Sequence, residues 1–212
     1  EHFIAVGWPT ERITRIANFC PDEAVAPQSR AELETPEDVP LVLALGRLHA
    51  NKGFDVLLAA LARLPDHYLW LGGSGKLGRR LKRQAEELGV TPRVRFLGWR
   101  AETAPLFAAA DMFACPSRME PFGNIIIEAW ARRVPVVAAT ATGPGALIED
   151  GKSGLLVPVD DAAALAEALQ RLREEDGLGP ALAAAGREVY ERGFTEEVVV
   201  RGYVDLLERL AG

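Results

Sequence analysis

Short apolar runs alternate with longer amphipathic segments along most of the chain. The predicted strands are Leu41–Gly46, Tyr68–Leu71, Val94–Leu97, Met112–Cys115, Val134–Ala138 and Leu155–Val157. The helical segments between them are Phe54–Leu64, Leu77–Leu88, Thr103–Ala110, Asn124–Arg132 and Gly145–Glu149. Continuous apolar strands separated by helices are typical of a parallel sheet that is covered on both faces. The pattern therefore predicts an α/β fold with right-handed crossovers.

The two ends of the chain differ from this alternation. A C-terminal helical tail is predicted as Asp160–Glu175, Leu178–Arg192 and Thr195–Leu210. Capping and acidic residues stand near the starts of the first and third of these helices, and glycines separate all three. Near the N-terminus, Ile13–Phe19 could form an edge strand, and Pro27–Pro40 is predicted to be a surface loop.

Composition narrows the classes of function. The 212 residues are 49% hydrophobic and 25% charged, as is common in globular proteins. The formal net charge of −6 argues against a general nucleic-acid-binding protein. No apolar run approaches the roughly 20 residues that a membrane span needs. The start, Glu1-His2-Phe3, lacks the basic region of a signal peptide and lacks Met, which indicates a fragment of a longer protein.

Cysteine and histidine usage argues against a disulfide framework and against metal chemistry. Cys20 and Cys115 are too few for such a framework. His2, His49 and His67 have no metal-ligand spacing. We therefore expect no metal site and a cytoplasmic location.

Two carboxylates, Glu120 and Glu128, flank a Pro-Phe-Gly-Asn turn and an isoleucine run. The run predicts the first turns of a buried helix, in which an unpaired Glu128 carboxylate would be costly. The N-terminus of such a helix suits a phosphate, because its N–H groups are free and its dipole is positive there. The segment thus indicates a site for a phosphorylated, hydroxyl-rich ligand. The simpler alternatives are a surface acid for Glu120 and an ion pair between Glu128 and Arg132.

A basic loop follows the first predicted strand. Arg47 and Lys52 stand in a segment that is bounded by Gly46 and Gly53 and opens a helix. An Arg fork and a Lys point charge together could hold a diphosphate. The alternative is a pair of solvated surface charges. Loops after parallel strands share one edge of the sheet, and this placement favours the binding interpretation.

The loop after the second predicted strand is rich in glycine. Gly73, Gly75 and Gly78 satisfy the G-x-G-x-x-G dinucleotide pattern, but no acid follows at the next strand end, where Trp99 and Arg100 stand. The presence of Arg100 keeps a phosphorylated dinucleotide cofactor among the possible ligands. We interpret the glycines as allowing a close backbone approach to a ligand of open identity.

Two further loops leave alternatives open. Trp99 could stack on a nucleobase or cover the edge of the sheet. The small-residue turn over residues 139–146 is either another anion-binding helix start or a tight connection.

Together these motifs resemble those of retaining GT-B glycosyltransferases of the large group 1 class. The matching stretches are E-P-F-G-N-I-I-I-E, G-R-L-H-A-N-K-G-F-D, V-R-F-L-G-W and D-G-K-S-G-L-L-V-P. More narrowly, M-E-P-F-G-N-x-x-x-E-A-W-A is similar to bacterial enzymes that build lipopolysaccharide and other cell-surface glycans. The resemblance runs from about Ile13 to the end of the chain.

The resemblance implies a role for each motif. Arg47, Lys52 and Glu120 would be the catalytic residues, the first two on the diphosphate of a UDP-, GDP- or ADP-sugar and Glu120 on its sugar hydroxyls. Donor-binding positions are implied at Gly46, Gly73, Gly75, Arg100, Phe122, Gly123, Asn124, Ile125 and Glu128. Among them, Glu128 would bind the ribose and Arg100 would flank the base.

The chemistry implied by the resemblance needs neither a metal ion nor a cofactor. The sugar is transferred with retention of configuration, by front-face attack. Cations and helix N-termini stabilise the leaving diphosphate.

The resemblance also implies how the chain is organised. Residues 1–40 would be an interdomain-proximal segment and surface loop. Residues 41–212 would be a doubly wound, Rossmann-like donor domain, one half of a GT-B fold whose N-terminal acceptor domain is absent. The final helix would then lack the domain across which it packs in relatives, and we expect the isolated chain to be nearly inactive. Contact with the inner face of the membrane is expected only through the full-length protein.

One position departs from the family pattern. Ala146 stands where relatives often carry a glutamate after the fifth strand. This departure keeps open a non-catalytic nucleotide-sugar-binding module as an alternative to the enzyme. A second alternative, based on Gly73, Gly75 and Gly78, is an NAD(P)-binding domain, which would leave Glu120 and Glu128 unexplained.

Overall fold

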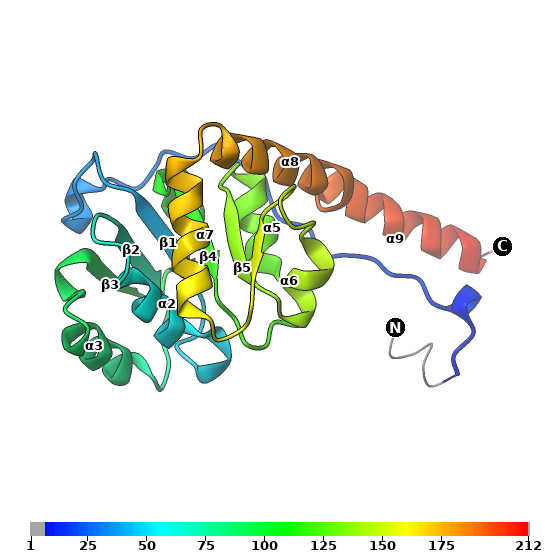
Figure 1. The fold of residues 1–212 in the computed structure, drawn as a ribbon. Coiled ribbons are helices and arrows are strands. Elements are labelled where there is room, and N and C mark those ends of the chain that lie inside the picture. The colour runs from blue at the N-terminus through cyan, green and yellow to red at the C-terminus, as the bar shows by residue number, and fades with distance from the viewer. Residues whose placement is uncertain (1–6, 212) are drawn as a thin grey trace.

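The computed structural model describes residues 7–211, so the predictions for Glu1, His2, Phe3 and the rest of residues 1–6 and 212 lie outside it. In the described chain, parallel strands form an open sheet with helices on both faces (Figure 1). The strands are β1 (Leu41–Leu45), β2 (Tyr68–Gly72), β3 (Val94–Gly98), β4 (Met112–Cys115), β5 (Val136–Ala139) and β6 (Leu155–Val157). They lie in the order β3-β2-β1-β4-β5-β6. The order reverses between β1 and β4, where ligands bind in sheets of this kind.

The helices follow the predicted alternation closely. They are α2 (Phe54–Leu61), α3 (Gly78–Glu87), α4 (Ala104–Ala109), α5 (Asn124–Ala131), α6 (Thr142–Leu147), α7 (Ala162–Glu174), α8 (Leu178–Gly193) and α9 (Glu196–Ala211). Short 3-10 turns are η1 (Thr10–Arg12), η2 (Ala31–Leu33), η3 (Ala50–Lys52) and η4 (Thr91–Arg93). The predicted doubly wound parallel sheet and the C-terminal helical tail are confirmed.

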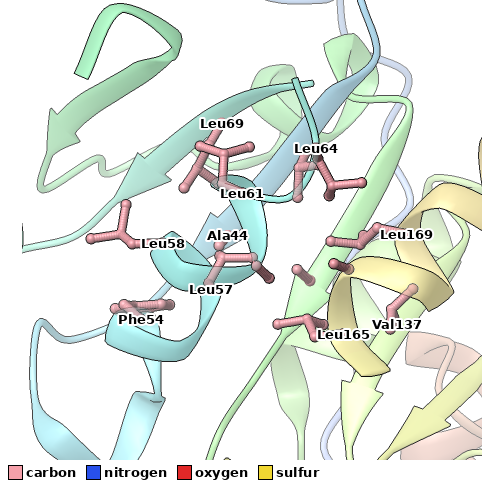
Figure 2. Close-up of a cluster of buried hydrophobic side chains, with 14 of the residues drawn as sticks. Ala44, Phe54, Leu57, Leu58, Leu61, Leu64, Leu69, Val137, Leu165 and Leu169 are labelled. Atoms are coloured by element: carbon pink, nitrogen blue, oxygen red, sulfur yellow. The ribbon is translucent and has the colours of Figure 1, made fainter. Parts of the chain in front are cut away.

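Successive residues of the strands point into two separate hydrophobic cores. Val42 and Ala44 of β1 face α2, α3 and α7, and Figure 2 shows the leucines of α2 and α7 meeting over the sheet. Leu41 and Leu43 face the other way, toward α4, α5 and α8. All four residues are fully buried. This burial on both faces explains why the strands are apolar without interruption.

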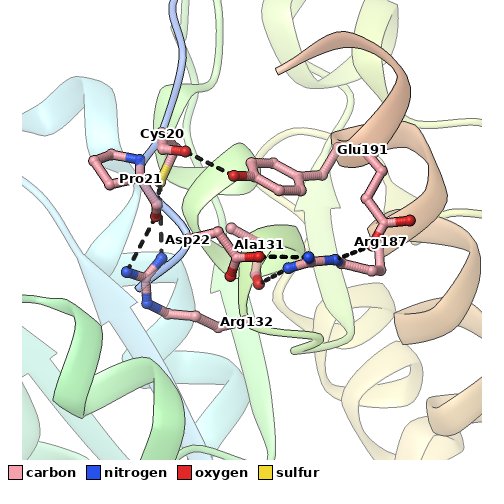
Figure 3. A network of polar contacts seen from close by, with 8 residues as sticks. Cys20, Pro21, Asp22, Ala131, Arg132, Arg187 and Glu191 are labelled. Carbon is pink, nitrogen blue, oxygen red and sulfur yellow. Dashed lines mark hydrogen bonds and ion pairs between the residues drawn. The ribbon is translucent and has the colours of Figure 1, made fainter. Parts of the chain in front are cut away.

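The edge strand predicted over Ile13–Phe19 is wrong. Within the described chain, residues 13–20 join no sheet, and β3 and β6 form its edges. The segment runs against helices instead. The Cys20 amide donates to the Phe194 carbonyl (3.1 Å), and the Tyr190 hydroxyl donates to the Cys20 carbonyl (2.7 Å; Figure 3). These contacts hold the residue that follows the segment against the C-terminal end of α8.

The predicted surface loop Pro27–Pro40 contains the 3-10 turn η2 and is fixed by one arginine. Arg30 donates to the carbonyl oxygens of Val39 (3.0 Å) and Ala109 (2.8 Å) and pairs with Asp111 (3.0 Å). Its side chain is 11% exposed. Arg30 thus ties the loop to the amino-terminal edge of the sheet.

Helix α9 extends beyond the body of the sheet (Figure 1). Val199 is buried, but much of the helix's apolar surface is open to solvent. The exposed apolar residues of α9 are Val198, Val200, Tyr203, Val204, Leu207 and Leu210. None of the helices in the described chain has the length and hydrophobicity that crossing a bilayer requires.

Candidate functional site

A pocket of about 500 Å³ lies at the carboxyl edge of the sheet, at the point where the strand order reverses. It is lined by Leu45, Gly46, Arg47, Lys52, Gly72, Gly73, Ser74, Trp99, Arg100, Thr103, Glu120, Asn124, Ile125 and Glu128. Loops far apart in sequence therefore meet here, as their position after parallel strands predicts. A hollow of about 460 Å³ lies at the opposite edge, but two of its charged groups, Arg30 and Asp111, pair with each other.

Two of the charged residues that line this pocket, Lys52 and Glu120, form an ion pair. The Lys52 ammonium, at the end of η3, donates to the Glu120 carboxylate in the loop before α5. The two side chains are only 25% and 12% exposed. Glu120 is thus not an isolated surface acid, and a cation and an anion stand together where a polar ligand would enter.

Glu128 occupies the side of the pocket formed by α5. Thr103 donates a hydrogen bond from its hydroxyl to the Glu128 carboxylate (2.9 Å). Burial raises the pKa of Glu128, and this hydrogen bond opposes the rise. Arg132 does not pair with it. The Arg132 guanidinium donates instead to the Cys20 thiol sulfur (3.7 Å) and the Pro21 carbonyl (3.4 Å; Figure 3).

The exposed residues that line the pocket include Arg47, Trp99 and Arg100. The Trp99 side chain is 72% exposed, which disfavours the alternative that it covers the edge of the sheet. Two cations and a flat aromatic surface are therefore available to a ligand that occupies the pocket.

The glycine-rich loop serves a close approach of backbone to backbone. An added Cβ on Gly73 would lie 1.8 Å from the Gly46 carbonyl oxygen, and one on Gly75 would lie 2.5 Å from that of Leu48. The loops after β1 and β2 can therefore touch only because these positions lack side chains. Gly73 also lines the pocket, whereas Gly75 is not among its lining residues.

Some residues of the turn into α5 line the pocket, and others pack against the rest of the protein. Gly123 opens the helix at a φ of 96°, a conformation that favours glycine. Asn124 and Ile125 line the pocket, but Phe122 and Gly123 do not. The Phe122 ring packs edge-on against Phe194, with 6.3 Å between ring centroids.

The turn after β5 is a tight connection to the Glu120 loop. The Gly143 amide donates to the Glu120 carbonyl (2.7 Å), and an added Cβ on Gly143 would lie 2.5 Å from that oxygen. Ala146, one turn further, faces a separate groove beside Arg15 and Phe194. Position 146 therefore lies outside the pocket that Lys52 and Glu120 line.

Sequence reasoning missed two residues of this region. Thr103, taken as a helix start, is the hydrogen-bond donor to Glu128. Arg118 was not singled out, although it stands two residues before Glu120 and makes ion pairs with Asp55 and Asp160. The sequence signal for Arg118 is its place in the loop after the predicted strand Met112–Cys115, which also contains Glu120.

The chain belongs to the group 1 family of glycosyltransferases. The family model described as "Glycosyl transferases group 1" matches residues 39–175. The fold is that of the C-terminal domain of the two-domain GT-B architecture.

Two curated relatives match almost the whole chain. The lipopolysaccharide core biosynthesis glycosyltransferase LpsE of Rhizobium meliloti is 41% identical over 207 residues, which are 98% of this chain and 61% of LpsE. LpsD of the same organism is 36% identical, over 96% of this chain and 59% of its own length. The chain therefore spans about three fifths of the length of these two curated relatives.

Solved structures of glycosyltransferases share the fold of this chain. HepE of Anabaena, in complex with UDP and glucose, superposes with a TM-score of 0.85 at 30% identity, over 99% of this chain and 60% of HepE. WaaG, a glycosyltransferase involved in lipopolysaccharide biosynthesis, superposes with a TM-score of 0.72 at 26% identity, over 81% of this chain and 48% of WaaG.

Proposed function

We propose that this chain binds the nucleoside-diphosphate sugar donor of a retaining glycosyltransferase whose acceptor is a glycan or lipid-glycan. The observation that carries the proposal is the convergence of Lys52, Glu120 and Glu128 on one pocket at the switch point of the sheet. A nucleotide sugar needs complementary groups for phosphate, sugar and ribose, and this pocket offers all three. The UDP-glucose complex of HepE supports the same type of ligand.

The diphosphate is assigned to Arg47 and Lys52. Both side chains line the pocket beside the loops after β1 and β2. When the bond to the sugar breaks, negative charge grows on the diphosphate, and fixed cations stabilise that charge without reorganisation. With two cations in place, no metal ion is required for this role.

The sugar and the ribose are assigned to the two glutamates. In the free chain, Lys52 forms an ion pair with Glu120. When the donor binds, its diphosphate would share the Lys52 ammonium, and a sugar hydroxyl would donate a hydrogen bond to Glu120. Glu128 already accepts a hydroxyl hydrogen bond from Thr103, and a ribose diol offers donors of the same kind. The base would lie near Trp99 and Arg100, on the exposed rim.

The domain boundaries belong to the same proposal. Residues 41–212 would form the donor domain, and an acceptor domain in the full-length protein would cover the exposed apolar residues of α9. The similarity to LpsE and LpsD favours an acceptor in lipopolysaccharide core synthesis.

A ligand panel tests the proposal. The thermal stability of the chain is measured with UDP-, GDP- and ADP-sugars and with NADP. A ligand at ~100 times its dissociation constant adds about 2.7 kcal/mol of stability. We expect one class of nucleotide sugar to stabilise the chain. Stabilisation by NADP alone would overturn the proposal in favour of a dinucleotide-binding domain. That alternative is weakened because Gly73 and Gly75 serve contacts between loops.

A further inference from the structure

Arg118 links three loops at the carboxyl edge of the sheet. Its guanidinium makes two hydrogen bonds to the Asp55 carboxylate (2.8 and 2.7 Å), at the start of α2. It also donates to the Asp160 carboxylate (2.5 Å), before α7, and to the Ala50 carbonyl (2.7 Å), in η3. The Arg118 side chain is 29% exposed and does not line the pocket.

These contacts lie next to the Lys52–Glu120 ion pair in both loops. The backbone amides of Arg118 and Met119 both donate to the Asn51 carbonyl (2.7 and 3.2 Å), one residue before Lys52. Glu120 follows Met119 directly. Lys52 and Glu120 are therefore each within two residues of this contact between loops.

The backbone leaves little room for the two loops to slide. An added Cβ on Gly53 would lie 2.0 Å from the Pro116 carbonyl oxygen, and Gly53 has a φ of 63°. On the other side of the loop, Gly143 donates to the Glu120 carbonyl. The Arg118 side chain thus adds its contacts to loops whose backbones already touch.

Charge adds a second effect. Asp55 and Asp160 are two carboxylates close to the loops that carry Lys52 and Glu120, and the Arg118 guanidinium offsets one of their two negative charges. Hydrogen bonding to Arg118 holds the pKa of Asp55 below its ordinary value, so Asp55 is ionised at neutral pH. Without Arg118, these uncompensated charges would repel an anionic ligand.

We propose that Arg118 is a positioning residue, which fixes Lys52 and Glu120 relative to each other so that the pocket can hold a nucleoside diphosphate. The role rests on the proposed function for the identity of the ligand. The link between Arg118 and the two loops rests on the hydrogen bonds alone.

The binding test uses the whole chain and titrates UDP, GDP and ADP in turn by calorimetry. Arg118→Ala should weaken the binding of the preferred diphosphate at least tenfold. Arg118→Lys keeps the charge but not the two-pronged contact with Asp55, so it should fall between Ala and the parent. Arg30→Ala is the matched control. It removes a more deeply buried, ion-paired arginine at the opposite edge, so it should lower the melting temperature and leave diphosphate affinity unchanged.

A double-mutant cycle separates positioning from a general loss of stability. If Arg118 acts through Lys52, then Arg118→Ala should cost much less affinity, threefold or less, in a Lys52→Ala background. Equal losses in both backgrounds would overturn the proposal.

Hydrogen exchange gives a readout that needs no ligand. In Arg118→Ala, the amides of residues 118 and 119 should exchange faster, while amides of β1 stay protected. Unchanged exchange at these amides would overturn the positioning role whatever the nucleotide results. If the parent chain binds none of the three diphosphates, the proposed function fails, and the assignment to a diphosphate site fails with it. If the parent binds and Arg118→Ala binds equally well, only the positioning role fails.

Discussion

Glu128 shows at the residue scale how a binding group can carry a cost in stability. Burial raises its pKa, so the folded chain disfavours the carboxylate form. Stability linked to this group is fully present below its ordinary pKa of about 4.5 and is lost as the pH rises through the raised value. As the pH rises above about 4.5, this group therefore makes the free chain progressively less stable.

The first prediction concerns Glu128→Gln. The variant should melt at a higher temperature than the parent at pH 7.5, with a smaller difference near pH 4.5. Its affinity for the preferred ribonucleoside diphosphate should fall about 10- to 100-fold, because a hydrogen bond to a charged group contributes roughly 1.5–3 kcal/mol. Calorimetry with the matching 2′-deoxynucleotide is the control, since the variant should discriminate less between ribose and deoxyribose. Undiminished discrimination would refute the ribose assignment.

His67 supplies a second prediction at this scale. It is 2% exposed, and neither ring nitrogen has a hydrogen-bond partner among the described residues. Burial lowers its pKa, so the unfolded chain takes up this proton more readily than the folded one. Stability should fall as the pH drops below about 6.5. In His67→Leu, the decrease in melting temperature from pH 7.5 to 5.5 should be smaller than in the parent.

The interpretation of His67 would be wrong if His67→Leu showed the same decrease in melting temperature between pH 7.5 and pH 5.5 as the parent.

The packing of α8 on α5 gives a prediction at the scale of elements. An added Cβ on Gly186 would lie 2.3 Å from the indole ring of Trp130, which is fully buried and donates to the Ser153 carbonyl (2.9 Å). Gly186→Ala should therefore destabilise the chain by roughly 1–3 kcal/mol, because Trp130 cannot move aside. Denaturant unfolding measures the change.

The same helix contains its own control. At Gly193, the last residue of α8, an added Cβ meets nothing within 4 Å. Gly193→Ala should be neutral or stabilising by up to about 1 kcal/mol, because Ala favours the helical backbone. Similar losses at both positions would mean that the contact with Trp130 is not what restricts Gly186.

The elements themselves were largely predictable, because strands buried on both faces need long apolar runs. The start of α6 was missed because Pro144 and Gly145 resemble a turn, although Pro is tolerated in the first turn of a helix. Ile13–Phe19 was mistaken for a strand because an extended segment packed on helices has a similar pattern. The pattern does not reveal which partner covers such a segment.

The site was predictable in its members but not in its pairings. Glu120, Glu128 and Lys52 were identified from their motifs, and the structure brings all three to one pocket. Thr103 lies 25 positions from Glu128, and Arg118 lies 63 positions from Asp55. Such contacts depend on the order of strands in the sheet, which local sequence does not specify.

At the scale of the whole molecule, the exposed apolar surface of α9 leads us to expect that the chain binds the donor but needs a further domain for sugar transfer. Leu207 and Leu210 are 64% and 75% exposed. The proposed acceptor domain would cover them and hold the acceptor near the donor's anomeric carbon. Transfer depends on that proximity, which contributes much of the rate in reactions between two substrates.

The last prediction is that this chain alone binds its donor but transfers little sugar. The measurement is release of the nucleoside diphosphate in the presence of lipopolysaccharide core acceptors. Lys52→Ala is the control, since any residual release that depends on the pocket should decrease in it. Robust turnover by the chain alone would show that the described residues already contain a complete active site.

The glycine contacts at the rim have a consequence for how the protein can diversify. Gly53, Gly73 and Gly143 each bring one loop against the carbonyl oxygen of another, so a change of length in any of these loops would disturb its neighbour. Trp99 and Arg100, by contrast, are exposed at the pocket. Natural drift and laboratory evolution should therefore reach new nucleobases most easily through these two side chains, while the part of the pocket that we assign to the diphosphate stays constant.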